Sequence, residues 1–306
     1  MDTTILILAS TVIAATPLII AALGVLVSER AGVLNLGVEG IMLVGAVTAF
    51  AVGTMSGNLF AGYVAAIGAG LVLGLLFAFL TLTLQTNQVA TGLALTLFGV
   101  GLSAFLGRSF VGLPIARIPT MEIPLLGDIP YVGPLLFRYD MVVYLSILLY
   151  LAVARFLNRS ASGLRLRAIG ESPVVAHSLG YPVIRIRYLA VMFGSAMCAV
   201  AGAYLSTALT PMWVEGMSAG RGWIVLALVV FATWRPLRVL LGAYLFGGMT
   251  VLQMHAQALG IAVPSEFLSM LPYAATIIVL VIICRDPKAI LLNQPASLGR
   301  SFHPNG

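Results

Sequence analysis

Charged side chains are scarce in this chain, and that scarcity sets its class. Of 306 residues, only 8% are charged while 60% are hydrophobic. A soluble domain carries about 25% charged residues, so this chain has too little polar surface to dissolve in water. The sequence therefore predicts an integral membrane protein. Its net charge of +6 then indicates contact with anionic lipid headgroups and is not a sign of nucleic-acid binding.

Lysine, histidine and cysteine are also rare, which excludes several kinds of site. Lys288 is the only lysine, and the chain has no P-loop pattern, so ATP hydrolysis would have to come from a partner chain. The three histidines lack the spacing of metal ligands, and we predict neither a metal nor another cofactor. Cys198 and Cys284 lie within apolar runs, where we expect packing roles and no disulfide.

Long apolar runs, by contrast, are abundant. A helix needs about 20 apolar residues to cross the bilayer core. No long soluble region separates the runs, so we predict an all-α, polytopic transmembrane helical bundle that forms one domain over residues 1–306. The first run is too long for a signal-peptide core, and we expect it to remain as the first span. The nine candidate segments are 3–27, 36–53, 59–84, 89–107, 140–157, 188–209, 222–234, 237–259 and 266–284.

Two of these segments are irregular. Segment 36–53 begins with a polar, glycine-rich stretch. Segment 222–234 reaches only roughly 20 Å as a helix, which is too short for a full span, so we predict a short or broken helix there. An Ala-Gly pair precedes each segment, and the two segments would run in opposite directions through the bilayer. This pattern is consistent with an inverted repeat.

Segment 59–84 carries a stripe of small residues on one helical face. Such a stripe favours close backbone contact with another helix, so we expect this face to be buried. Its members, four residues apart, are Gly62, Ala66, Gly70, Gly74 and Ala78.

The longest polar interruption, residues 158–187, lies between two strongly apolar runs and carries five arginines. Ser172 is a suitable N-cap, Pro173 suits the first helical position, and Gly180 suits a left-handed C-terminal residue. We therefore predict a short surface helix at 174–179. One interpretation is a docking surface for a cytoplasmic protein. The other is an ordinary positive loop that only fixes topology.

The basic residues predict the orientation of the chain. If residues 158–187 are cytoplasmic and the segments alternate, most basic residues lie inside. The positive-inside rule then favours an outside N-terminus and a cytoplasmic C-terminus. The inside set is Arg30, Arg155, Arg159, Arg165, Arg167, Arg185, Arg187, Arg235, Arg238, Arg285, Lys288 and Arg300, and the outside set is Arg108, Arg117, Arg138 and Arg221.

Several polar residues lie at the starts of apolar segments. An ionisable residue within a span usually faces a cavity or a partner. One interpretation places Glu39 and Asn35 on the translocation path. The other places Glu39 at the cytoplasmic interface, paired with Arg30. Three polar residues at the start of the fourth segment also have two interpretations. They contact a polar solute, or they cap the helix. These residues are Asn87, Gln88 and Thr91.

Residues 216–220 match the Gly-x-Ser-x-Gly pattern of serine hydrolases, with Ser218 at the centre. In soluble hydrolases the pattern follows a strand and precedes a helix, whereas here it falls in a predicted external loop. An intramembrane serine protease that uses Ser218 and His255 is therefore an alternative of another class. The simpler interpretation is a flexible turn before the half-helix.

Three blocks of sequence carry a wider resemblance: residues 30–43, with Gly-Val-Glu-Gly at 37–40; residues 163–180; and residues 220–236. They resemble the permease subunits of bacterial ABC importers that move branched-chain amino acids, simple sugars and nucleosides. The Gly-Val-Glu-Gly form is most similar to the nucleoside branch, whose receptors are lipoproteins of the basic-membrane-protein type. The common form of the second block has Asn at the position of Ser172, which leaves the fold intact but could alter the docking contact.

The resemblance implies a transport subunit of the bacterial inner membrane that is not itself an enzyme. It would translocate a small polar solute by alternating access, with nucleosides as the first expectation and simple sugars or branched-chain amino acids as the alternative. It implies three partners: a second permease in a heterodimer, a cytoplasmic ATP-binding subunit and an external solute-binding lipoprotein. Residues 158–187 would be the coupling segment on which the ATPase docks, with these candidate residues: Gly170, Glu171, Ser172, Pro173, Ala176 and Gly180.

Overall fold

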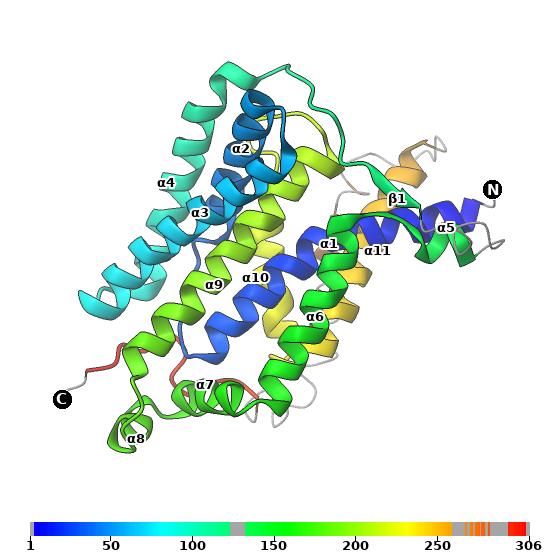
Figure 1. Ribbon diagram of the computed structural model, residues 1–306. Coiled ribbons are helices and arrows are strands. Elements are labelled where there is room, and N and C mark those ends of the chain that lie inside the picture. The colour runs from blue at the N-terminus through cyan, green and yellow to red at the C-terminus, as the bar shows by residue number, and fades with distance from the viewer. Residues whose placement is uncertain are drawn as a thin grey trace.

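Helices make up most of the structure, a computed structural model that describes residues 3–122, 132–258 and 293–303 and isolated positions between 267 and 281 (Figure 1). The long helices are α1 (Thr3–Arg30), α2 (Val38–Ser56), α3 (Leu59–Ala78), α4 (Gln88–Gly107), α6 (Met141–Arg159), α9 (Val183–Tyr204) and α11 (Pro236–Ala258). The short ones are α5 (Val132–Leu136), α7 (Ala161–Glu171), α8 (Pro173–Ser178) and α10 (Arg221–Phe231).

Within the described part of the chain, seven helices are long and apolar enough to cross a membrane. Together with α10 they match the first eight predicted segments to within a few residues, which confirms the polytopic helical bundle. α10 has only 11 residues, or about 16 Å of helix, so the predicted short helix is also confirmed. Within the ninth predicted segment, 266–284, the structure describes only isolated positions, each of them helical.

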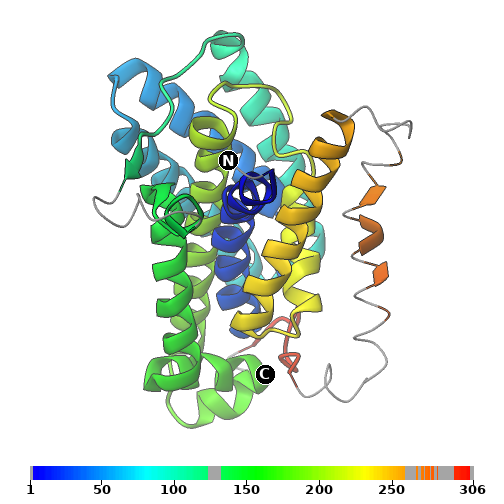
Figure 2. The ribbon, with the colours of Figure 1, turned by 90° about the vertical axis from the view of Figure 1, so that its right-hand side faces the viewer.

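The two ends of the bundle differ. We call the end that carries α7, α8 and residues 293–303 the base, and the opposite end the top (Figure 1). Between them, α1, α2 and α9 supply most of the fully buried apolar side chains. Figure 2 shows α1 between α6 and α11. The core is therefore a set of central helices enclosed by outer ones.

Small residues allow the central helices to touch. A Cβ atom added to Gly45 would overlap the backbone of Ala199, and one added to Gly202 would overlap the backbone of Met42. Because lipid provides no hydrophobic force between helices, such close backbone packing stabilises the bundle. The stripe predicted on segment 59–84 is buried as expected, and Gly70 packs on α9 at Ala199.

α3 and α9 form an antiparallel pair with a local two-fold relationship. Each ends in a π-helical turn, η1 (Phe79–Thr83) and η3 (Leu205–Leu209). Tyr63 near the start of α3 hydrogen-bonds Thr207 at the end of η3, and Tyr188 near the start of α9 hydrogen-bonds Thr83 at the end of η1. The inverted repeat stays a prediction, and this exchange of equivalent contacts is the kind of feature that it would produce.

The structure also contains elements that the sequence analysis did not predict. Residues 161–171, taken above as part of a polar loop, form the helix α7. Ser160 caps its start by accepting a hydrogen bond from Gly163 N (2.9 Å), and Leu166 and Ile169 are buried while Leu164 is exposed. At the top, β1 (Thr120–Glu122) pairs antiparallel with β2 (Arg138–Asp140). α7 was not predicted because only one side of the helix is apolar, so the segment contains few apolar residues and is polar overall.

Candidate functional site: a central junction and a base platform

Helix α4 gives the depth of the polar segment that precedes α2. Its 20 residues span about 30 Å, the thickness of a bilayer core. At its base end, the side-chain oxygen of Gln88 accepts a hydrogen bond from Leu34 N (2.8 Å). Further along, Thr96 donates to the carbonyl oxygen of Leu36 (2.8 Å). The segment before α2 therefore rises from the base along α4 into the interior of the bundle.

The segment before α10 enters from the other end. Trp213 packs against Gly107 at the top end of α4, whereas Gly40 packs against Gly99, about 12 Å closer to the base by the helical rise. Residues 214–220 connect the level of Trp213 to the start of α10. Two irregular segments thus enter the bundle from opposite ends and meet near its mid-depth.

Glu39 occupies the meeting point. Its Oε1 atom accepts hydrogen bonds from the Ser218 hydroxyl (2.5 Å) and from Gly220 N (2.9 Å), and its Oε2 atom accepts one from Gly222 N (2.6 Å). The Glu39 side chain is buried, with 7% of its surface exposed. We call these four residues the central junction. Both carboxylate oxygens are satisfied within the chain, as burial of such a group requires.

The chemistry of the central junction suits a helix start. The first N–H groups of a helix have no partner within it and carry a partial positive charge, so a carboxylate there satisfies and stabilises the start of α10. Gly220 has a φ of +79°, a conformation that glycine adopts readily. A Cβ on Gly222 would lie 2.6 Å from Glu39 Cα, so only glycine allows this approach.

The interpretation that paired Glu39 with Arg30 is wrong. The Arg30 guanidinium donates to the carbonyl oxygen of Trp234 from Nε (3.1 Å) and Nη2 (2.7 Å), and to that of Asn293 from Nη1 (3.1 Å). Arg30 therefore caps the C-terminal end of the α10 region at the base, while Glu39 lies deeper in the bundle. A role for Glu39 beside the translocation path remains a prediction.

The serine protease alternative is also wrong. Ser218 has 1% of its surface exposed, and its hydroxyl donates to Glu39. Among the described residues, no hydrogen bond joins it to His255, the base that the alternative needs. A nucleophile must reach its substrate, and the buried Ser218 hydroxyl cannot do so. The motif is a turn that brings a hydroxyl to a buried carboxylate.

The other residues predicted for the translocation path lie at the base end of α4 and before α2. Asn87 is the N-cap of α4, accepting from Ala90 N (3.0 Å). Gln88 is buried. Its side-chain oxygen accepts from Leu34 N, as described above, and its side-chain nitrogen donates to the Arg300 carbonyl oxygen (3.4 Å). The oxygen of Asn35 accepts from Gly37 N (2.8 Å). Thr91 shares a hydrogen bond with Thr86 (2.8 Å). The capping interpretation is thus confirmed for Asn87.

The predicted surface helix is present at the base. α8 covers Pro173–Ser178, one residue earlier than expected, with Ser172 as N-cap accepting from Val175 N (3.3 Å). Gly180 has a φ of +84°, as its predicted role as the left-handed C-terminal residue requires. The capping signals therefore predicted the position of this helix correctly.

α8 presents apolar side chains outward. Val174, Val175 and Leu179 have 60%, 58% and 71% of their surfaces exposed. We call this face, formed by these three residues, the base platform. Exposed apolar side chains gathered on one short surface helix are typical of an interaction surface.

The six candidate coupling residues fall into two groups. Gly170 and Ala176 are buried, and a Cβ on Gly170 would overlap the carbonyl oxygen of Arg30. These two residues hold the platform against the bundle and cannot touch a partner. The others are exposed or half-buried at the surface: Glu171, Ser172, Pro173 and Gly180.

A segment that the sequence analysis did not single out, residues 293–303, runs across the base. Ser297 donates to the carbonyl oxygen of Gly170 from its backbone nitrogen (3.0 Å) and from its hydroxyl (2.7 Å), and Gly299 N donates to the carbonyl oxygen of Gly32 (3.3 Å). Buried Arg187 donates to the Ser297 hydroxyl (2.9 Å). We call residues 293–303 the base strap.

The base strap also joins the platform to α4. Phe302 packs with Ile169, Ala176 and Val183, and its carbonyl oxygen accepts from Gln85 (3.3 Å), just before α4. Phe302, an aromatic residue in a polar stretch, was the one signal in the sequence that could have indicated this packing. Contacts therefore run from α8 through the strap to the base end of α4.

Known proteins match this chain over most of its length, including the elements described above. The chain matches, over residues 7–280, the family described as branched-chain amino acid transport system permease component. A putative glucose ABC transporter permease protein from Haloferax volcanii is 43% identical over 96% of each chain. A nucleoside ABC transporter permease protein from Lactococcus lactis and a guanosine ABC transporter permease protein from Bacillus subtilis are 33% and 31% identical, each over 90% of this chain and 91% of the relative. The chain therefore belongs to this family of permease components, which are transport subunits, and is a multi-pass membrane protein.

Proposed function

We propose that the chain is the membrane-spanning permease subunit of an ATP-driven importer, with its base in the cytoplasm and its N-terminus outside. The observation that carries the proposal is the base platform, an exposed apolar surface at the end of the bundle richest in arginine. Because the chain has no P-loop pattern, the energy must come from an ATP-binding subunit. We infer that this subunit docks on the platform and along its edge at Glu171, Ser172, Pro173 and Gly180.

The contacts at the base give the docking surface a route to the interior. Movement of α8 would pass through Phe302 and the base strap to the start of α4. It would also pass through Ser297, which contacts Gly170, and Gly299, which contacts Gly32 at the foot of the segment that leads to Glu39. Since the central junction ties α2 to α10, these helices would move together. Alternating access would then result from rocking of rigid helices.

The proposed translocation path passes the polar residues near the start of α4. Asn87 is exposed and Thr91 is half-buried, so these two could meet a polar solute directly. Gln88 and Asn35 are buried and hydrogen-bonded to backbone. Together with Glu39, they would shape the path from behind it by fixing the irregular segments.

For the solute, we propose nucleosides. The Gly-Val-Glu-Gly block supports this class, as do the two relatives named for a nucleoside and for guanosine. A simple sugar is the second candidate because the relative that is 43% identical is named for glucose. The importer would include a second permease chain and an external solute-binding lipoprotein, in a bacterial cell membrane.

The platform can be tested without damaging the fold. Val175→Glu places a carboxylate in the first turn of α8, where the helix tolerates negative charge. The change removes an apolar side chain from the surface that the ATP-binding subunit would contact. We expect solute-stimulated ATP hydrolysis by the reconstituted importer to fall at least about tenfold, as for loss of a central interface residue. Met55→Glu is the matched control, since Met55 is an exposed apolar residue on α2 toward the top. Unchanged coupling in Val175→Glu would refute the docking role.

The solute can be tested separately in the same proteoliposomes. With the complete importer, we expect uptake of a labelled nucleoside to depend on ATP and to be displaced by other nucleosides. A 100-fold excess of glucose or leucine should leave uptake unchanged. Displacement by glucose instead, with no nucleoside uptake, would assign the importer to sugars and leave the coupling mechanism standing.

A further inference from the structure

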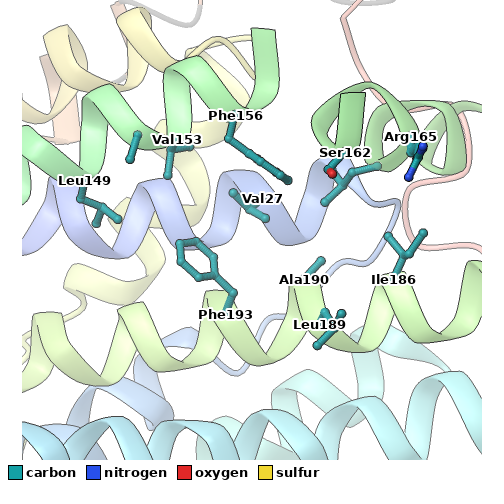
Figure 3. Close-up of a pocket in the computed structure, with 12 residues that line it drawn as sticks. Val27, Leu149, Val153, Phe156, Ser162, Arg165, Ile186, Leu189, Ala190 and Phe193 are labelled. Carbon is teal, nitrogen blue, oxygen red and sulfur yellow. The ribbon is translucent and has the colours of Figure 1, made fainter. Parts of the chain in front are cut away.

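A groove runs along the side of the bundle between α6 and the α3–α9 pair. It comprises a cavity of about 540 Å³ in the base half and one of about 600 Å³ in the top half. Leu149 and Ala152 of α6 line both cavities, so the two lie next to each other along α6. Val27 and Ile20 of α1 lie at the floor of the base and top halves. Figure 3 shows the base half, with Phe156 facing Phe193 and Ala190 across it. We call this feature the lateral groove.

The lateral groove is apolar along its length but not at its base end. Arg165 and Ser162 of α7 line the base end, whereas no charged residue lines the top half in the described part of the chain. The Arg165 guanidinium lies 5.7 Å from the centroid of the Tyr181 ring. It has no hydrogen-bond partner among the described residues, so its donors are available to a ligand.

The ends of the groove select its occupant. Its walls are apolar over most of their length, whereas the exposed Arg165 guanidinium lies at its base end. An apolar helix of a second chain would leave this guanidinium without an anionic partner. A hydrocarbon chain is narrower and matches the apolar walls, and the groove lies where lipid surrounds the bundle. The free guanidinium at one end then requires an anionic group attached to that chain.

We propose that the lateral groove binds one anionic phospholipid from the leaflet on the base side, with an acyl chain between α6 and α9 and the phosphate at Arg165. A guanidinium presents paired N–H donors that match phosphate oxygens, and basic pockets between membrane helices on the cytoplasmic side bind anionic headgroups. The Ser162 hydroxyl is placed to donate to the same headgroup. The lipid would fill the space that separates α6 from α9 and support α7, from which the platform extends. The proposal depends on the membrane setting and not on the identity of the transported solute.

Native mass spectrometry of the purified full chain tests the proposal. The delipidated protein is titrated with phosphatidylglycerol or with phosphatidylcholine of the same acyl chains. We expect one phosphatidylglycerol molecule to be retained in preference to phosphatidylcholine. Arg165→Ala should weaken this binding about fivefold, the factor that corresponds to one basic residue at a headgroup. Arg155→Ala is the matched control, because Arg155 is an exposed arginine near the same end that does not line the groove.

A second pair of variants tests the acyl-chain site. Ala152→Trp fills the point where the two halves meet, and we expect it to abolish retention of the lipid. Gly101→Trp adds the same side chain to α4 where nothing lies within 4 Å, and it should retain the lipid. Equal binding of the two lipids would overturn the proposal, as would equal effects of Arg165→Ala and Arg155→Ala. Retention of the lipid by Ala152→Trp, or a dimer of the chain that forms without lipid and is lost in Ala152→Trp, would also overturn it.

Discussion

The two ends of α10 are held by the same short stretch of chain, residues 29–39, but with opposite chemistry. At the start of α10, Glu39 accepts hydrogen bonds from backbone N–H groups. Past its end, Arg30 donates two hydrogen bonds to the Trp234 carbonyl oxygen. A negative group at the start and a positive group at the end both match the helix dipole. Residues 29–39 therefore hold both ends of a half-helix that is about 16 Å long.

The two ends differ in how fully their buried polar groups are satisfied. Glu39 uses both carboxylate oxygens. At the other end, Glu29 Oε2 accepts from the Trp234 indole nitrogen (2.6 Å), while Glu29 Oε1 has no hydrogen-bond partner among the described residues. An incompletely satisfied buried group contributes less to stability. The comparison indicates that the start of α10 is the rigid end and that the base end holds it less tightly.

The largest expected effect comes from Gly222→Val at the rigid end. The added side chain would overlap the Glu39 backbone, so α10 could not approach α2. We expect loss of monodisperse protein in size-exclusion chromatography after detergent extraction. Gly68→Val is the control, since a Cβ there meets nothing within 4 Å. Normal folding of Gly222→Val would show that the close approach is dispensable.

Glu39→Gln should have the next largest effect. The amide group has one acceptor where the carboxylate has two, and its NH₂ group would face backbone donors. We expect a loss of about 2–3 kcal/mol, typical of hydrogen bonds to a charged group, and a clear drop in the midpoint of heat-induced loss of monodisperse protein. The exposed Glu215 offers the control Glu215→Gln, which should behave as the parent. Parental stability of Glu39→Gln would mean that the charge is not needed.

Trp234→Phe tests the base end with a smaller expected effect. It removes the indole donor to Glu29 but keeps the ring and the backbone carbonyl that Arg30 uses. We expect a loss of about 1–2 kcal/mol, less than for Glu39→Gln, in the same heating assay. Trp223→Phe, at a half-exposed position on α10, is the matched control. A larger loss than for Glu39→Gln would reverse the order of the two ends.

Ser218→Ala should have the smallest effect of the series. Glu39 keeps its two backbone donors, so we expect a loss of about 1 kcal/mol or less and ATP-driven uptake close to that of the parent. Ser301→Ala, at an exposed position, is the control. Complete loss of activity with intact folding would restore a chemical role for this hydroxyl.

Much of the fold followed from composition and local signals. Length and hydropathy predicted the spans because the bilayer requires about 20 apolar residues for each. Ser172, Pro173 and Gly180 predicted α8 because capping is a local interaction. α7 was missed because its apolar side contains few residues, and the base strap was missed because its contacts are with residues far away in sequence.

The candidate site was predicted in part. Glu39 was correctly identified as a buried charge, but one of its two interpretations paired it with Arg30, nearby in sequence, whereas the observed partners lie about 180 residues further along the chain. The Gly-x-Ser-x-Gly pattern indicated an unusual turn at Ser218 but could not show that the hydroxyl is buried. The first error came from inferring a partner from sequence proximity, and the second from inferring a site from a short motif.

By itself, the sequence determined that this chain is a helical membrane protein, where its spans lie and where a capped surface helix projects, because burial in lipid and helix capping depend on neighbouring residues. Only the tertiary structure decided that two irregular segments meet at Glu39, that residues 293–303 tie the platform to α4, and that a groove opens beside α6. These features depend on how helices pack against one another, and the close contacts of small residues that control this packing involve pairs that the order of the chain does not reveal.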